Sequence, residues 1–509
     1  MTAAFDDIVV GAGSGGAVIA ARLSEDTGRR VLLIEAGPDY PSKQATPPSL
    51  LNGATPAFDH DWGFVADMTP GRPWDYARGR VVGGSSAVNA CLALRGLPSD
   101  YDEWRDLGLD LWSWDQVAPV FRAIEHDVDV EDEHHGVDGP IQVRRHAVDA
   151  LTPGQAAFYQ ACKDLGFPEA ADHNHPDSTG LGTGPWNLEA DGTRISSALA
   201  YLTDARGRPN LTIAGERLVD KVVIENGRAS AVEAIGPNGS ERFEARRITL
   251  AGGAIGTPAI LLRSGVGDPA ELQRLGVPIA VARPGVGRNL IDHARVGAGW
   301  RAVEGLLDEH SPYLEAFLRY TASASPRFND MQAMLFQGQV MPTMSVRAQL
   351  MKPVSVGRLT LTSRAPETQP HIDLNLLSEA EDMRRMVDGL RLVARLIAAP
   401  RIAQLGARRL ILDDGAEMDA DAFRAALEDD DWAADYAYRA VRHYVHPVGT
   451  ARMGREDDED AVVDQQGRVH GIPNLYVADA SVMPTQPSAN TNFPTIMIAE
   501  RIAAWMRKA

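Results

Sequence analysis

The order of hydrophobic and polar positions near the N-terminus predicts a strand, a helix and a second strand. Residues 8–10 are a short apolar β-branched run, residues 17–23 are mostly small or apolar helix formers, and residues 31–34 are again continuously apolar. Short apolar runs separated by a helix are typical of buried parallel strands that helices cover on both faces. The first part of the chain is therefore predicted to have an α/β fold.

Later patterns predict further strands and helices. Residues 208–235 contain short alternating runs, and the Gly-Pro-Asn-Gly turn at 236–239 predicts a hairpin. Residues 247–251 predict a strand that leads into a Gly-rich turn and a helix. In the middle of the chain, strands are predicted at 359–362 and 372–374, and amphipathic helices at 379–399 and 419–429.

The end of the chain again predicts a strand followed by a helix. Residues 474–479 form an apolar run that ends in an acid. The last helix is expected to begin near Pro494, with Thr491 and Asn492 as capping candidates.

Two polar stretches predict loops. Residues 37–75 are rich in Pro, Gly and Asp, and a long irregular segment of this kind usually covers a site. The charged residues 125–138 predict a solvated loop. His134 and His135 lie in it, but no third ligand stands at a spacing that would suggest a metal site.

Composition fits a globular enzyme with small-molecule partners. The chain has 509 residues, too many for one ordinary core, which predicts two closely joined domains. The net charge of −19 disfavours nucleic acid and anionic membranes, and no apolar run reaches the roughly 18 residues of a membrane span. Cys91 and Cys162 provide no disulfide framework. Because the first predicted strand begins almost at once, no secretory signal is expected, and a cytoplasmic location is predicted.

A Gly-rich turn, GAGSGG at residues 11–16, joins the first predicted strand to the helix. In a dinucleotide-binding fold, such glycines allow a tight turn, close approach of a pyrophosphate and close packing of the helix, whose N-terminus attracts the phosphates. The second predicted strand ends on Glu35, which is placed to bind both hydroxyls of an adenosine ribose. Its charge favours FAD or NAD over NADP.

Several separated motifs resemble the signatures of the glucose–methanol–choline (GMC) flavin oxidoreductases. They are RGRVVGGSSAVN at 78–89, GGAIGTP and its continuation at 252–267, GVGRNLIDH at 285–293, HPVGTARMG at 446–454 and DASVMP at 479–484. The motifs occur in the family's order over nearly the whole chain. The chain is therefore identified as a member of this family, most similar to bacterial members of the hydroxymethylfurfural and aryl-alcohol oxidase type.

The resemblance implies a mixed α/β and α+β architecture. Residues 1–292 would form most of a Rossmann-like FAD-binding domain, with insertions that line the active site. Residues 293–435 would form an interleaved sheet-and-helix substrate domain. Residues 436–509 would return to the FAD-binding domain and carry the catalytic pair.

The resemblance also implies which residues contact FAD. Val82 and Gly84 would pass close to the isoalloxazine or ribityl chain. Val88 stands where some relatives carry a tethering His, so FAD is expected to be non-covalent, and no metal is expected. The full expected set is Gly11, Ala12, Gly13, Ser14, Gly15, Gly16, Glu35, Ala36, Val82, Gly84, Asn89, Ala90, Cys91, Val219, Asp479, Ala480 and Thr491.

His446 and Asn490 match the family's catalytic pair. A His titrates near neutral pH and can accept the hydroxyl proton, whereas an amide can hold the substrate oxygen but is no base. His443 is a nearby rival for the role of base, and His293 is expected to be structural.

The expected reaction is hydride transfer from a small primary alcohol, aromatic or allylic, to flavin N5, giving an aldehyde. Met331, Met334, Phe336 and residues 337–344 are expected either to line an apolar pocket or to belong to the core. Tyr444 is expected either to hinder oxygen or to line the pocket, which leaves oxygen or another electron acceptor open.

Other functions also stay open. The first alternative is a sugar, polyol or choline-type dehydrogenase with an acceptor other than oxygen. A redox-silent flavoprotein is disfavoured because His446 and Asn490 are both present. A nicotinamide-dependent dehydrogenase is disfavoured because it would lack the motifs at 252–267 and 446–454.

Overall fold

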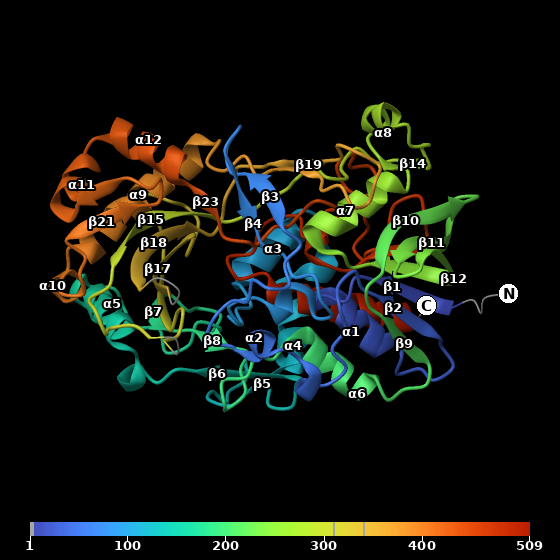
Figure 1. The fold of residues 1–509 in the computed structure, drawn as a ribbon, viewed down its shortest axis with the longest axis horizontal. Coiled ribbons are helices and arrows are strands. Elements are labelled where there is room, and N and C mark those ends of the chain that lie inside the picture. The colour runs from blue at the N-terminus through green and yellow to red at the C-terminus, as the bar shows by residue number, and fades with distance from the viewer. Residues whose placement is uncertain (1–4, 309–310, 339–341, 509) are drawn as a thin grey trace.

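The computed structural model describes residues 5–308, 311–338 and 342–508, which form a mixed α/β fold (Figure 1). The first sheet has the strand order β10-β11-β12-β1-β2-β9, and β24 pairs with β12. Its core, β9, β2, β1, the end of β12 and β24, is parallel. Its strands are β1 (Phe5–Val10), β2 (Val31–Ile34), β9 (Leu211–Ala214), β10 (Leu218–Glu225), β11 (Arg228–Gly236), β12 (Gly239–Leu250) and β24 (Leu475–Val477).

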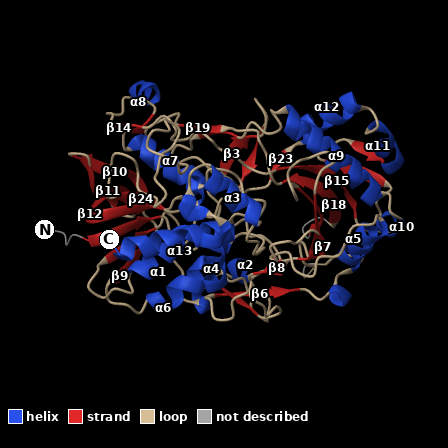
Figure 2. Cartoon of the chain, turned by 180° about the vertical axis from the view of Figure 1, so that it is seen from behind, coloured by secondary structure: helices blue, strands red, loops and turns tan. Residues whose placement is uncertain are grey.

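Helices cover the first sheet, as the alternating pattern predicts. Helix α1 (Ser14–Leu23) follows β1 and packs beside α13 (Asn492–Lys508), so the first and last helices of the described chain are neighbours (Figure 2). Helix α7 (Gly253–Arg263) follows β12 and packs against β10. The predicted hairpin at 236–239 is confirmed, because β11 and β12 are antiparallel across it.

The second sheet is antiparallel, in the order β22-β21-β15-β18-β17-β16-β7, with β23 paired to β15. Helix α9 (Ala380–Ile397) packs on one of its faces, where a Cβ on Gly389 would lie 2.8 Å from both Ala348 Cβ and Met331 Cε. The strands are β7 (Gly180–Thr183), β15 (Ala294–Arg301), β16 (Ala316–Tyr320), β17 (Met331–Gly338), β18 (Thr343–Leu350), β21 (Arg409–Leu412), β22 (Glu417–Asp419) and β23 (Arg442–His443).

Smaller elements complete the described chain. The predicted strands at 359–362 and 372–374 correspond to β19 and β20, and the predicted helices at 379–399 and 419–429 correspond to α9 and α11. The remaining strands are β3 (Phe64–Asp67), β4 (Pro73–Tyr76), β5 (Glu125–Asp127), β6 (Ile141–Arg145), β8 (Pro185–Trp186), β13 (Val266–Gly267), β14 (Val281–Ala282), β19 (Arg358–Thr360) and β20 (His371–Asp373). The remaining helices are α2 (Pro48–Leu51), α3 (Pro98–Asp106), α4 (Trp114–Ile124), α5 (Pro153–Asp164), α6 (Thr203–Ala205), α8 (Pro269–Leu275), α10 (Pro400–Ala403), α11 (Ala420–Ala426) and α12 (Asp430–Ala440).

The segment 37–75 is less irregular than predicted, because it contains α2 and the antiparallel pair β3 and β4. The division of the chain at 292/293 and 435/436 stays a prediction. Strand β7 nevertheless lies in the second sheet, although it precedes residue 292.

The prediction of a solvated loop at 125–138 is wrong for its functional groups. Glu125, Asp127 and His135 are buried and lie close enough to hold a metal ion. Their charges are already compensated within the protein: His135 Nδ1 lies 3.0 Å from Asp127, and Arg145 lies 2.8 Å from Asp127. This buried ion-pair cluster also includes Arg95 and Asp172, which lie about 30 or more residues away in sequence, so local composition did not reveal it.

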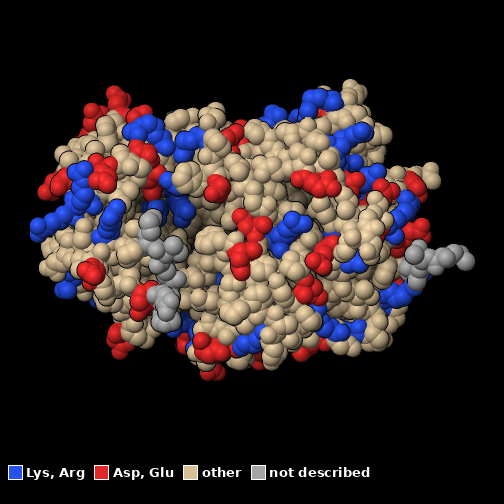
Figure 3. All heavy atoms as spheres, viewed as in Figure 1, with Lys and Arg blue, Asp and Glu red and all other residues tan. Residues whose placement is uncertain are grey.

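The face of the molecule in Figure 3 carries charges of both signs. Acidic and basic side chains are interspersed over the face shown in Figure 3. Among the described residues, no helix is both long and apolar enough to cross a membrane.

Candidate active site

The Gly-rich turn after β1 is held by backbone contacts that exclude side chains. Gly11 has a φ of +93°, and a Cβ there would lie 2.5 Å from Ala251 O. A Cβ on Gly15 would lie 2.0 Å from Ala478 O, and one on Gly16 would lie 1.8 Å from Gly11 O. Such distances are far below van der Waals contact, so the turn, β12 and the residue after β24 approach as closely as glycine allows. The exposed N–H groups at the start of α1 then suit a pyrophosphate.

Glu35 directly follows β2, beside this turn, and is buried. Its carboxylate accepts hydrogen bonds from the N–H groups of Ala12 and Gly37, both at 2.9 Å. Burial raises its pKa, and the N–H groups of Ala12, Gly37 and Ala36 oppose that rise. A carboxylate has about four lone-pair positions, so it can still accept the two hydroxyls of a ribose. These contacts fit the binding of an FAD adenosine.

The first signature packs directly on the turn. Gly83 N–H donates to Ala12 O at 2.8 Å, and a Cβ on Gly84 would lie 2.6 Å from Gly13 Cα. Val82 and Gly84 are buried there. The structure therefore places the 78–89 motif against the Gly-rich turn at 11–16.

Asn89, Ala90 and Cys91 are organised by Arg194, which sequence reasoning missed. Asn89 Oδ1 accepts hydrogen bonds from Cys91 N–H at 2.9 Å and from Arg194 Nη1 at 3.0 Å. Arg194 is buried and also donates to the carbonyls of residues 50, 52 and 55. Arg194 thus connects residues 89–91 to the end of α2 and the loop that follows it. No motif marks Arg194, so only tertiary structure identifies it.

Cys91 has a left-handed backbone, with a φ of +60°, and its side chain is buried. Burial raises the pKa of its thiol, while nearby Arg194, at 3.1 Å from the sulfur, opposes the rise. A neutral thiol in this position fits the expected role of a small packing group.

The expected contacts near the C-terminus also converge. Asp479 is buried and accepts hydrogen bonds from Gly253 N–H and Ser481 N–H, both at 2.8 Å. It therefore joins the start of α7 to the segment after β24. Ala480 O accepts from Gly449 N–H at 3.3 Å, which links this segment to the loop of His446.

Ser14, Thr491 and Val219, three further expected contacts, lie around the same region. Asn492, next to Thr491, accepts a hydrogen bond from the Ser14 hydroxyl at 2.7 Å, so the starts of α1 and α13 meet. Val219 lies in β10, two residues after Arg217, whose N–H donates to Glu35 O at 2.8 Å. This position is consistent with the expected contact to adenine.

His446 and Asn490 come from distant segments and touch. Asn490 Nδ2 lies 3.0 Å from His446 Nε2, and His446 Nδ1 lies 3.0 Å from His293 Nδ1. His293 Nε2 lies 3.1 Å from Pro487 O, a pure acceptor, so this nitrogen carries the proton. His293 Nδ1 is then an acceptor, which assigns the proton on His446 to Nδ1. This hydrogen-bond chain leaves a lone pair on Nε2 of His446.

His446 is neutral in this environment. Burial, followed by His293, Arg78 and Arg295, holds the pKa of His446 well below its usual value. Burial also lowers the pKa of His293, to about 3. His293 thus orients the imidazole of His446. The signal in the sequence was the final His of the 285–293 motif.

The backbone before His446 is strained and fixed on both sides. Val445 has a φ of +58°, an uncommon conformation for a β-branched residue. Arg78 donates to Val445 O at 2.6 Å, and Asp292 Oδ1 accepts from His446 N–H at 2.9 Å. Burial raises the pKa of Asp292 to about 6. Two GMC-like motifs thus hold the imidazole in place.

His443 faces a different direction. Its Nε2 lies 2.8 Å from Asp75 O, and burial lowers its pKa to about 3. Tyr444 instead packs against the imidazole of His446, with ring centroids 4.6 Å apart. The Tyr444 hydroxyl lies 3.0 Å from Met334 Sδ.

The expected apolar wall is divided between the two faces of the second sheet. Met334 and Phe336 lie in a buried cluster with Tyr444 and Cys91. Met331 lies under α9, on the opposite face. Of the expected segment 337–344, residues 339–341 lie outside the described residues.

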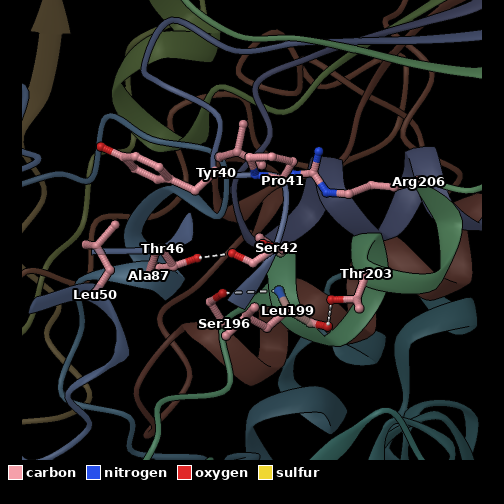
Figure 4. A pocket seen from close by; sticks show the side chains of 12 residues that line it. Tyr40, Pro41, Ser42, Thr46, Leu50, Ala87, Ser196, Leu199, Thr203 and Arg206 are labelled. Atoms are coloured by element: carbon pink, nitrogen blue, oxygen red, sulfur yellow. Dashed lines mark hydrogen bonds between the residues drawn. The ribbon is translucent and has the colours of Figure 1, made fainter. Parts of the chain in front are cut away.

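A small pocket opens beside Val82 and the π-helical turn at 198–202 (Figure 4). Several of its polar groups are bonded locally: Thr46 Oγ1 donates to Ser42 O at 2.9 Å, and Thr203 Oγ1 donates to Leu199 O at 2.7 Å. Its lining includes neither His446 nor Asn490. The pocket therefore borders the 78–89 motif and is separate from the contact between His446 and Asn490.

Two family models, both described as GMC oxidoreductase, match residues 5–295 and 353–499. The chain therefore belongs to the GMC oxidoreductase family. It is an FAD-dependent enzyme that acts on CH–OH groups.

Relatives and solved structures match over nearly the full length. The chain is 37% identical to 5-(hydroxymethyl)furfural oxidase of Methylovorus sp. (strain MP688), covering 98% of each chain. It is 33% identical to oxygen-dependent choline dehydrogenase 1 of Chromohalobacter salexigens, covering 99% of this chain and 95% of the relative. Among structures, pyridoxine 4-oxidase from Mesorbium loti is 31% identical, with a TM-score of 0.89 and 99% coverage of both chains.

Proposed function

We propose that the protein oxidises a small primary alcohol, aromatic or allylic, to an aldehyde, with His446 as base and Asn490 as the residue that holds the substrate oxygen. The observation that carries the proposal is the relay from Pro487 O through His293 to His446, which leaves Nε2 of His446 without a proton. The hydroxyl proton then has a defined acceptor. Asn490 Nδ2, which lies 3.0 Å from that nitrogen, can donate to the same oxygen.

The chain's residues prepare this proton transfer before substrate binds. His446 stays neutral because its pKa is held well below its usual value by burial. Its ring is fixed by His293 on one side and packed by Tyr444 on another. General-base catalysis by such a positioned imidazole contributes roughly 10²–10⁴-fold to the rate.

FAD, when bound, supplies the acceptor for the hydride that leaves the carbinol carbon. The turn at 11–16, Glu35, the 82–91 segment and the 479–480 segment would hold it. Val88 at the expected tethering position supports non-covalent binding. In this proposal residues 1–292 and 436–509 hold the cofactor, and residues 293–435 provide most of the substrate side.

A choline-type substrate fits the site less well. Arg78 and Arg295 are close enough to lower the pKa of His446, so a quaternary ammonium group would meet positive charge. A carboxylate would be needed to attract the ammonium group. Glu315, a buried carboxylate just before β16, already accepts a hydrogen bond from Thr152 N–H at 3.0 Å. The relative named for 5-(hydroxymethyl)furfural supports a ring-bearing primary alcohol.

The electron acceptor is proposed to be oxygen or another small oxidant, and the location to be cytoplasmic. Cys91 and Cys162 are both buried free thiols, which suits a reducing compartment.

The test is anaerobic mixing of the purified holoenzyme with benzyl alcohol, glucose and choline, followed by loss of the yellow flavin absorbance. Benzyl alcohol is expected to act fastest and to yield benzaldehyde. Reduction by glucose or choline but not by benzyl alcohol would favour the sugar or choline alternative. Acid precipitation should leave the yellow FAD in solution, and colour retained by the pellet would contradict non-covalent binding.

A further inference from the structure

A row of polar side chains crosses the second sheet on the face opposite α9. In the register of the sheet, Arg295 on β15 pairs with Gln349 on β18, Gln349 pairs with Gln332 on β17, and Gln332 pairs with Arg319 on β16. Directly paired residues point to the same face of an antiparallel sheet. The four side chains therefore form one polar row, which we call the Arg–Gln row. The residues next to them in each strand point toward the α9 side.

The row contains buried polar atoms without hydrogen-bond partners. Both terminal atoms of Gln332 and both terminal atoms of Gln349 are buried and unpartnered. The same is true of Nε of Arg295, and of Nε and Nη2 of Arg319. Buried polar groups in proteins are normally bonded, so a group of this size points to a ligand that supplies acceptors.

One end of the row reaches the reaction centre. The Arg295 guanidinium carbon lies 5.7 Å from the Tyr444 ring centroid and 5.9 Å from that of Phe336. The same Tyr444 ring lies 4.6 Å from the imidazole of His446. Arg295 and the catalytic base therefore border the same aromatic side chain.

Arg295 carries a charge that the described chain does not compensate. Among the described residues, no carboxylate forms an ion pair with it. Asp413, which accepts from Gly297 N–H at 2.8 Å two residues further along β15, is taken by Arg347 at 2.7 Å. A half-buried guanidinium without an anion, beside a substrate site, is the group that binds a carboxylate most effectively, because its planar donors match the two oxygens.

Building on the proposed function, we infer that the preferred substrate is a primary alcohol whose aromatic ring also carries a carboxylate, bound by Arg295 with Gln349 as a second donor. The alcohol group would lie at His446 and Asn490, and the ring would lie against Tyr444 and Phe336. Arg295 offers the planar donors that a carboxylate needs, and Arg442, its register partner on β23, adds a second positive charge at this end of the row. The reacting alcohol carbon still loses a hydride to FAD and its proton to His446, so the redox balance of the proposed reaction is unchanged.

The experiment compares 4-(hydroxymethyl)benzoate with its methyl ester, which has a similar shape but no charge. Initial rates of aldehyde formation give kcat and KM for the holoenzyme and for Arg295→Gln and Arg295→Lys. The parent is expected to prefer the acid by roughly 10- to 100-fold in kcat/KM, the range of a charge-assisted hydrogen bond. The preference should disappear in Arg295→Gln and survive in part in Arg295→Lys, which keeps the charge. Measurable oxidation of the ester shows that each variant is folded.

The possible failures are distinct. A parent that oxidises the ester as well as the acid overturns this inference and leaves primary alcohol oxidation in place. A preference for the acid that persists in Arg295→Gln overturns the assignment to Arg295. A parent that oxidises neither compound but oxidises glucose contradicts the proposed function itself.

Discussion

Around the cofactor turn of the first sheet, backbone meets backbone, and a Cβ on Gly15 or Gly16 would lie 2.0 Å or less from a carbonyl oxygen. On the site-facing side of the second sheet, long side chains point into the interior, and several of their polar atoms lack partners. The first arrangement admits one ligand shape and tolerates almost no substitution. In the second arrangement, the strands can carry other side chains at these positions without backbone clashes. In the proposed function, steric restriction would hold the cofactor and adjustable polarity would select the substrate.

The largest effect should come from His446, the base in the proposed function. His446→Ala is expected to lower the rate of alcohol oxidation about 10²–10⁴-fold because the hydroxyl proton loses its acceptor. FAD content should be unchanged, since the cofactor contacts lie elsewhere. Stopped-flow reduction of the flavin measures the rate, and His443→Ala is the matched control. A greater loss in the control would move the base to His443.

The cofactor side should be sensitive to a single methyl group. Gly16→Ala would place Cβ 1.8 Å from Gly11 O, and overpacking of this kind costs about 1–3 kcal/mol or more. A methyl group on Gly256, in α7, would meet nothing within 4 Å outside its own helix, so Gly256→Ala should be neutral or stabilising. Urea unfolding of both variants and their FAD content give the measurement. Equal stabilities would show that the turn is not sterically closed.

The sequence predicted the cofactor side better than the substrate side for a physical reason. Close backbone approach requires glycine, and glycines at fixed spacing are visible in a sequence, as at 11–16. The catalytic pair was visible through its motifs, and the contact between His446 and Asn490 agrees with that expectation.

The Arg–Gln row was not visible, because ordinary residues acquire their role through strand pairing. Gln332, Gln349 and Arg295 lie on three strands, and no sequence spacing connects them. Arg194 and the partners of His135 were missed for the same reason. Tertiary structure alone brings these groups together.

Glu35, which follows β2, should affect the affinity for FAD more than the rate of catalysis. Glu35→Ala is expected to weaken FAD binding by about 1.5–3 kcal/mol for each lost charge-assisted hydrogen bond. Titration of the apoprotein with FAD measures this loss. Ala12 and Gly37 donate to different oxygens of Glu35, so Glu35→Gln keeps an acceptor for only one of these N–H groups and should fall between the parent and the Ala variant. Unchanged affinity in both variants would exclude Glu35 from ribose binding.

The buried ion-pair cluster should make stability depend on pH. Burial alone would lower the pKa of His135, but its hydrogen bonds to Asp127, Asp172 and Glu125 raise it to about 10. Because the folded pKa exceeds the unfolded value of about 6.5, this stabilisation is complete below pH 6.5 and is lost as the pH rises toward 10. The slope is about 1.4 kcal/mol per pH unit for one proton.

Urea unfolding between pH 6 and pH 10 measures this slope in the parent and in His135→Gln. The variant should lose most of it. His134→Gln, a change at the neighbouring and more exposed histidine, should keep it. Parallel pH profiles for the parent and His135→Gln would show that His135 does not hold the extra proton.

A substitution on the second sheet should raise the free energy of unfolding, in contrast to Gly16→Ala in the cofactor turn. Gln332→Leu removes two buried polar atoms without partners and keeps a similar volume. The free energy of unfolding is expected to rise by about 1 kcal/mol, because no desolvated amide remains. Reduced stability in Gln332→Leu would indicate that the amide is already satisfied in the folded protein.

The packing of α13 on α1 determines when the nucleotide-binding turn can be completed during synthesis. Helix α1 and the turn before it leave the ribosome long before β24 and α13, which complete the same sheet and cover the same helix. The nucleotide-binding turn therefore stays incomplete, with uncovered apolar faces, until residues 475–508 have emerged. FAD can be held only after that point, and a chain cut short before Leu475 should be an aggregating fragment without FAD.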